Sequence, residues 1–231
     1  MNVKRIRECD IGKVHLFKNI SGASIKNILE ESSIRKLEKK EVLFRENDSI
    51  SKIYFLLEGK VSTFKISENG ERKIIFMLKE GEMINEVLVD NRRNSTIGCE
   101  AFEKSLVLEC DMKNFLYYME RDFALTKNIL SYSELRTRRL YRQLKNSISI
   151  KIDKKLAAKL YRISKEFGIK NGEWTLINFN LTITYLADML GCKRETLSRS
   201  MKILQDQNLV KIDGKKIYTK KEELAKYFKG N

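Results

Sequence analysis

The fold of the C-terminal part of the chain is decided by residues 181–199, LTITYLADMLGCKRETLSR. This stretch predicts two short helices joined at a glycine. Thr182 is placed to cap the first helix. Three apolar residues recur there at helical spacing, namely Leu186, Ala187 and Leu190. Gly191 then provides the positive φ that a sharp turn into the second helix requires.

The second predicted helix has two unlike faces. Leu197, Met201 and Leu204 fall at i, i+4 and i+7 and form one apolar stripe. A solvated helix face also mixes its charges, but here the turn and the two-faced second helix occur together. This combination favours a helix-turn-helix. The polar face consists of Arg194, Glu195, Ser198, Arg199 and Lys202.

The residue types on the polar face suit the reading of base edges. Arginine donates two hydrogen bonds to guanine and glutamate accepts one from cytosine, so Arg194, Glu195 and Arg199 can distinguish G·C from C·G in a major groove. Ser198 and Lys202 can contact a base edge or a phosphate. We therefore expect double-stranded DNA as a partner.

A β-hairpin is predicted directly after the second helix. Residues 209–212 and 215–218 alternate apolar side chains on either side of Asp213-Gly214, a strong hairpin signal, and three lysines flank the turn. The hairpin completes a winged helix-turn-helix. We expect Lys215 to contact the DNA backbone.

The charge distribution agrees with this prediction. The net charge is +15, and residues 147–231 hold 18 Lys and Arg against 9 Asp and Glu. Phosphate contacts supply much of the affinity of DNA-binding proteins. A lysine-rich composition is an alternative explanation, so the charge is supporting evidence only.

Length and composition indicate a globular protein of one or two domains. A chain of 231 residues with 42% hydrophobic and 33% charged residues is long enough to bury a core. No apolar run approaches the ~20 residues that cross a membrane. The basic N-terminus is not followed by an apolar segment. We expect a cytoplasmic protein with no membrane partner.

Cysteine and histidine usage gives little support to enzymatic or metal chemistry. The four cysteines, Cys9, Cys99, Cys110 and Cys192, form no C-x-x-C pair, which favours reduced thiols over an iron–sulfur cluster. A redox-sensing thiol at Cys9, Cys99 or Cys110 stays open. His15 is the only histidine, and no phosphate-binding glycine loop is found. We expect no enzyme, no catalytic residue, no metal and no cofactor.

The N-terminal half predicts a small barrel or jelly roll. Three β-rich runs, 52–57, 61–66 and 73–78, are separated by the turn signals Glu58-Gly59 and Asn69-Gly70. Residues 96–99 and 105–110 are expected to form one further hairpin. Short, evenly spaced strands of this kind are typical of a roll rather than of a parallel sheet.

A long helix is expected over residues 122–147, since no turn residue interrupts it. Packing on the roll would explain its apolar residues alone. We favour a parallel two-helix dimer interface, because a helix-turn-helix commonly reads two half-sites through a two-fold dimer. We call the predicted interface the seam: Phe123, Leu130, Thr137 and Leu144 at a, with Thr126, Ser133, Leu140 and Ser147 at d.

These motifs resemble one known family. GCKRETLSR at 191–199, LQDQNL at 204–209 and the Asp213-Gly214 wing are similar to the cyclic-AMP receptor protein/FNR superfamily of bacterial transcription regulators. IYFLLEGKV at 53–61 resembles that family's β-roll signature. The base-reading positions of the family fall here on Arg194, Glu195, Ser198 and Arg199.

The resemblance implies an α+β fold in three parts. Residues 1–121 would form a cyclic-nucleotide-binding-like β-roll that senses an effector, 122–147 a dimerisation helix, and 148–231 the winged helix-turn-helix. It also implies a homodimer, with RNA polymerase as a further partner.

The ligand side departs from the family pattern. Nucleotide-binding members have a Gly-Glu-Leu cassette followed by an Arg-Ser/Thr pair; this chain has Asn85-Glu86-Val87 and then Asn94-Ser95-Thr96. The resemblance still leaves Glu86 to hold a ribose hydroxyl and Arg93 to reach a phosphate. We favour another small molecule or a vestigial pocket. The candidate effector-binding residues are Glu86, Arg93, Ser95, Thr96, Ser133 and Thr137.

Three functions are weighed on this evidence. The first is a homodimeric regulator that binds a palindromic operator under control of a small-molecule or redox effector. The second is a constitutive DNA-binding regulator of the same fold with a vestigial effector pocket. The third is a cupin-like metal enzyme with a DNA-binding appendage, against which the single histidine argues.

Overall fold

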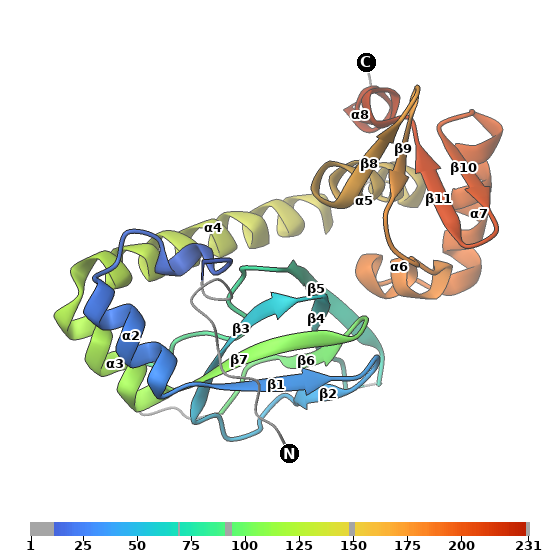
Figure 1. Ribbon diagram of the computed structural model, residues 1–231. Coiled ribbons are helices and arrows are strands. Elements are labelled where there is room, and N and C mark those ends of the chain that lie inside the picture. The colour runs from blue at the N-terminus through green and yellow to red at the C-terminus, as the bar shows by residue number, and fades with distance from the viewer. Residues whose placement is uncertain (1–11, 69, 91–93, 148–150, 230–231) are drawn as a thin grey trace. The chain divides into compact units, whose positions relative to one another are not determined.

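The computed structural model describes residues 12–68, 70–90, 94–147 and 151–229 (Figure 1). The chain divides into two compact units. One consists of residues 1–66 and 74–139, and the other of residues 67–73 and 140–231. Among the described helices, none has the length and hydropathy required to span a bilayer.

The first unit is built around two antiparallel sheets that form the expected β-roll (Figure 1). The three runs predicted as strands are confirmed as β3, β4 and β5. One sheet has the order β1-β7-β3, with β1 Ser33–Leu37, β7 Ser105–Asp111 and β3 Lys52–Glu58. The other has the order β2-β6-β4-β5, with β2 Val42–Phe44, β6 Gly98–Ala101, β4 Lys60–Ile66 and β5 Arg72–Lys79.

The hairpin expected from residues 96–99 and 105–110 is wrong. Both segments are strands, but β6 pairs with β2 and β4 whereas β7 pairs with β1 and β3. The chain crosses from one sheet to the other between them, where the Phe102 N–H and the Ser105 hydroxyl both donate to the carbonyl of Lys60. Alternation in the sequence identifies a strand but not its partner.

Short helices close one end of the roll. These are the 3-10 helix η1 (His15–Phe17), α2 (Gly22–Glu30) and α3 (Met112–Arg121). The ring of Phe55 in β3 contacts those of Phe17 and Phe115, with centroid distances of 5.0 and 5.6 Å, and the latter two lie 6.5 Å apart. This aromatic contact joins the helices to the buried core of the sheets.

The long helix is confirmed as α4 (Phe123–Ser147). It begins after Asp122, whose carboxylate accepts hydrogen bonds from the N–H groups of Ala124 and Leu125 and from the Ser24 hydroxyl. Such an acceptor satisfies N–H groups that the first helical turn leaves unpaired. The buried carboxylate therefore fixes where α4 starts.

The first part of α4 buries one face against its own roll and leaves the seam exposed. Leu125, Ile129 and Arg136 lie on the buried face. Leu130 and Leu144, on the seam, are 62% and 66% exposed. The seam therefore does not serve to attach the helix to the roll.

Besides the end of α4, the described part of the second unit contains helices α5 to α8 and a four-stranded antiparallel sheet of order β10-β11-β9-β8. The β8–β9 hairpin was not anticipated by the sequence analysis. The helices are α5 (Ile152–Phe167), α6 (Ile183–Leu190), α7 (Arg194–Asp206) and α8 (Lys221–Lys229). The strands are β8 (Gly168–Asn171), β9 (Trp174–Ile177), β10 (Val210–Asp213) and β11 (Lys216–Thr219).

The core of this unit gathers on α5. Leu156 and Leu160 of that helix are fully buried, as are Leu186 of α6, Leu197 of α7 and Leu224 of α8. Each surrounding helix thus contributes its apolar stripe to one common core. This packing holds α6 and α7 in fixed positions.

Candidate nucleic-acid interface and effector site

The turn between α6 and α7 has the predicted geometry. The Thr182 hydroxyl accepts a hydrogen bond from the Tyr185 N–H at 3.1 Å, which confirms it as the N-cap of α6. Gly191 has φ 66° and ψ 50°, and its N–H donates to the carbonyl of Ala187 at 2.8 Å. A glycine ends α6 in the left-handed region because that conformation strains other side chains.

Helix α7 presents the predicted polar face to solvent. Its apolar stripe, Leu197, Met201 and Leu204, is buried. The opposite side chains are all exposed, and no hydrogen bond or ion pair within the described residues engages them. They are therefore available to an external partner. These side chains are Arg194, Glu195, Ser198, Arg199 and Lys202.

The wing forms, but its turn lies one residue later than predicted. Asp213 pairs with Lys216 in the register of β10 and β11, so the two turn residues are Gly214 and Lys215. Gly214 has φ 57°, as the first position of a two-residue hairpin turn commonly requires. The shift places Lys215 at the exposed tip of the wing.

Asn85, which occupies the position of the cassette glycine, hydrogen-bonds to the backbone of the roll. It is buried, its side-chain oxygen accepts the N–H of Tyr54 at 2.9 Å, and its amide donates to the carbonyl of Lys52 at 2.9 Å. The side chain thus satisfies two backbone groups of β3. The position of the cassette glycine is therefore occupied by a side chain that hydrogen-bonds to the roll.

Three side chains of α4, spaced about one helical turn apart, bind residues 82–86 through two hydrogen bonds and an ion pair. The Tyr132 hydroxyl donates to the Met83 carbonyl at 2.9 Å, and the Arg136 guanidinium donates to the Ile84 carbonyl at 3.0 Å. Arg139 forms an ion pair with the buried Glu82 at 2.9 Å. A displacement of residues 82–86 would therefore act directly on α4.

Arg136 is a further candidate for the effector site, and the sequence did not point to it. It is 7% exposed, and its Nε and Nη1 atoms are buried without a hydrogen-bond partner. Nη1 lies 3.9 Å from a carboxylate oxygen of Glu86, and the guanidinium lies 5.2 Å from the ring centroid of Phe76. Unsatisfied buried donors on a charged group are costly, so this site favours an added acceptor.

Within the described residues, no hydrogen bond joins another candidate effector residue to Glu86. Ser95 is buried, and its hydroxyl donates to the carbonyl of Ile97 at 2.7 Å; Thr96 is exposed. Ser133 and Thr137 are exposed on α4 and donate to carbonyls of their own helix. Arg93 lies outside the described residues.

Two of the cysteines considered as redox sensors are in unreactive surroundings. Cys99 and Cys110 are buried. Burial raises the pKa of the Cys110 thiol to about 12, which disfavours the reactive thiolate. Cys9 lies outside the described residues.

Comparison with known families assigns both units. Residues 34–122 match the cyclic nucleotide-binding domain, and residues 154–227 match the Crp-like helix-turn-helix domain. The first match covers all strands of the roll except the first residue of β1. The second covers α6, α7 and the wing.

Curated relatives match most of the chain at low identity. The cAMP-activated global transcriptional regulator CRP of Pasteurella multocida is 23% identical over 193 residues, which cover 82% of this chain and 90% of that protein. The anaerobic regulatory protein of Bacillus subtilis is 22% identical over 228 residues, which cover 97% of this chain and 93% of that protein.

Solved structures share the fold. FixK2 from Bradyrhizobium japonicum has a TM-score of 0.74 at 15% identity, covering 84% of this chain and 96% of that one. The c-di-GMP responsive regulator CLP of Xanthomonas campestris has a TM-score of 0.75 at 18% identity, covering 86% of this chain and 99% of that one.

A cyclic-nucleotide-binding-type roll, a long helix and a winged helix-turn-helix together define a DNA-binding transcription regulator with an effector-binding domain. The chain belongs to the Crp/Fnr superfamily.

The exposed face of α7 leads to a prediction about sequence reading. Arg199→Ala should lower affinity for a specific operator by about 1–3 kcal/mol and relax the preference at one base pair, as loss of a bidentate base contact does. Lys215→Ala, at the wing tip, should instead weaken binding to all sequences. Fluorescence anisotropy with cognate and scrambled duplexes measures both effects. An unchanged ratio of cognate to scrambled affinity in Arg199→Ala would show that this residue does not read bases.

Proposed function

We propose that the protein is a homodimeric, effector-responsive transcription regulator that binds a palindromic operator through Arg194, Glu195, Ser198 and Arg199. The single observation that carries this proposal is the exposed, unengaged polar face of α7, held opposite a buried apolar stripe. Lys202 and Lys215 would add phosphate contacts. We propose RNA polymerase as a further partner. We also propose that the protein acts in the cytoplasm and has no enzymatic activity of its own.

The exposed seam of α4 supports the homodimer. A helix 25 residues long that leaves large apolar side chains in water gains stability when a second copy covers them. The hydroxyls of the polar seam residues Ser133 and Thr137 donate to carbonyls of their own helix, so a partner helix can cover them without leaving unpaired donors.

We propose that residues 1–121 form the sensing domain, residues 122–147 the dimerisation helix and residues 148–231 the DNA-binding domain.

The contacts between α4 and residues 82–86 support control by a small molecule. A ligand that engages Glu86 or completes the hydrogen bonds of Arg136 would change how this segment holds α4, and hence the seam. We propose a small-molecule effector rather than a thiol switch at Cys99 or Cys110. The constitutive regulator with a vestigial pocket is the second candidate, favoured by Asn85, which fills the cassette position.

The dimer interface is tested by Leu130→Glu combined with Leu144→Glu. These substitutions place a carboxylate on two seam positions of each chain, where dimerisation would bury them against their symmetry mates. We expect sedimentation velocity to show monomers and operator binding to fall with the dimer. The matched control is Leu135→Glu with Ser131→Glu, which adds the same two negative charges at exposed positions of α4 outside the seam.

An intact dimer in the seam variant would place the interface elsewhere on the molecule. Equal dissociation of the seam variant and the control variant would mean that added negative charge, and not the seam, explains the result.

The altered cassette leads to a prediction about cyclic nucleotides. The Asn85 amide is committed to β3, and the Asn94 amide donates to the carbonyl of Asn47 at 3.0 Å. A cyclic phosphate therefore lacks both a close backbone approach and a cation at the family's position, and each charge-assisted hydrogen bond is worth about 1.5–3 kcal/mol. Calorimetric titration with cyclic AMP and cyclic GMP should show no binding at tens of micromolar. Tight binding that Arg93→Ala abolishes would restore the nucleotide-sensing function.

A further inference from the structure

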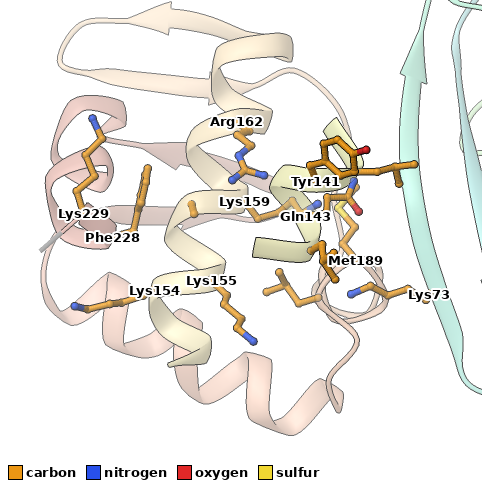
Figure 2. A pocket seen from close by; sticks show the side chains of 14 residues that line it. Lys73, Tyr141, Gln143, Lys154, Lys155, Lys159, Arg162, Met189, Phe228 and Lys229 are labelled. Carbon is orange, nitrogen blue, oxygen red and sulfur yellow. The ribbon is translucent and has the colours of Figure 1, made fainter. Parts of the chain in front are cut away.

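The second unit contains a cavity that no residue of α7 lines. It is therefore separate from the α7 face that we assign to DNA binding. Its volume is about 610 Å³, and it is lined by the end of α4 together with α5, α6 and α8 (Figure 2). Pockets that bind small organic molecules typically measure ≈ 300–1,000 Å³. The cavity is therefore large enough for an organic ligand.

One part of the cavity wall is apolar. Helix α4 contributes leucines and a tyrosine, α6 a methionine and a leucine, and α8 a phenylalanine, so each of these helices presents apolar surface to the same space. Such a wall suits a ligand with a hydrocarbon or aromatic body. The residues concerned are Leu140, Tyr141, Leu144, Met189, Leu190 and Phe228.

The other part of the wall is cationic. Lys155, Lys159 and Arg162 follow one face of α5 at i, i+4 and i+7, and all three line the cavity. Like charges at this spacing destabilise a helix. None of the described residues lining the cavity carries a carboxylate to balance them.

Two of these cations, Lys159 and Arg162, interact with one carboxylate, that of Glu166, only through its charge at a distance. Within the described part of the chain, no hydrogen bond or ion pair holds Lys159 or Arg162. In Figure 2 the Lys159 side chain extends from α5 toward Gln143 of α4. Burial, together with the charge of Arg162, lowers the pKa of Lys159 to about 8. The charge of Glu166 offsets only part of this lowering, so the negative charge near this ammonium group does not balance the loss of water.

We propose that this cavity binds an anionic amphiphile, a molecule with a carboxylate or phosphate head on an apolar body. The head would lie between Lys159 and Arg162, where its negative charge adds to the partial compensation by Glu166, and the body would lie along Leu144 and Met189. Arginine suits either head group, because its planar fork donates two parallel hydrogen bonds. This site is separate from Glu86 and Arg136, so it goes beyond the function proposed above.

The proposal is tested by titrating the full-length protein with decanoate in a calorimeter. Acetate is the control for the head alone, decanol is the control for the body alone, and decyl phosphate tests the alternative head. We expect decanoate to bind saturably and acetate and decanol to bind at least about tenfold more weakly, because each lacks one half of the recognised chemistry. Decyl phosphate that binds more tightly than decanoate would identify the head group as a phosphate.

Three variants place the ligand in the cavity. Lys159→Met should weaken decanoate binding at least about tenfold, since it removes the charge but keeps the apolar stem. Lys165→Met changes an exposed lysine of the same helix outside the cavity and should leave affinity unchanged. Ala158→Phe should block binding by filling the space, because Ala158 lines it. Circular dichroism establishes that each variant is folded.

Any one of three results would overturn the proposal. These are the absence of saturable binding up to about 1 mM, equal affinities of Lys159→Met and the wild type, or equal binding of decanol and decanoate. Leu140 and Leu144 also belong to the seam, so the partner's α4 is the competing occupant. Binding of decanoate by a monomeric Leu130→Glu variant but not by the wild-type dimer would assign the cavity to the partner helix. None of these results depends on operator binding.

Discussion

The hydrogen bonds and the ion pair that Tyr132, Arg136 and Arg139 make to residues 82–86 determine what the rest of α4 can do. They bind one face of the helix to the roll at i, i+4 and i+7, so the seam, on another face, stays in solvent. Two donor atoms of the buried Arg136 guanidinium lack hydrogen bonds, so its charge depends on the hydrogen bond to the Ile84 carbonyl and on the Glu86 carboxylate at 3.9 Å. The contacts to residues 82–86 and the exposed seam therefore lie on two sides of one helix.

In the second unit, the corresponding constraint is the core around α5. Because α6, α7 and α8 all place fully buried leucines against Leu156 and Leu160, the polar face of α7 has one fixed orientation relative to its own unit. The left-handed Gly191 sets the angle between α6 and α7 without strain. A rigid reading face can then respond to an effector only by movement of the unit as a whole.

The sequence predicted the parts of the molecule that depend on local rules. The Thr182 cap, the Gly191 corner, the stripe of Leu197, Met201 and Leu204, and the roll strands β3 to β7 follow from spacing and turn chemistry, whereas β1 and β2 were not predicted. The pairing of β6 and β7 was predicted wrongly, because strand partners are set by long-range packing. The wing turn was displaced by one residue for a related reason, since the register follows the Ile212–Ile217 pair.

The effector side was less accessible to sequence reasoning. Arg136 stands in a run with Arg138 and Arg139, and nothing in that run distinguishes a buried arginine from a solvated one. Likewise, Asn85 was identified as a departure from a glycine, but its two hydrogen bonds to β3 depend on a contact between distant segments. The candidate residues Ser133 and Thr137 satisfied a heptad pattern, and only the fold shows that both hydroxyls donate to carbonyls of their own helix.

The central claim, that two α7 helices of a dimer read one operator, is tested most directly by sequencing the duplexes that the wild-type protein selects from a random pool. A two-fold dimer that reads DNA with both α7 helices should select two inverted copies of one half-site. Their centres should lie about one helical turn, roughly 10–10.5 base pairs, or a multiple of that distance apart. A single half-site without its inverted copy, or a pool without any sequence preference, would contradict it.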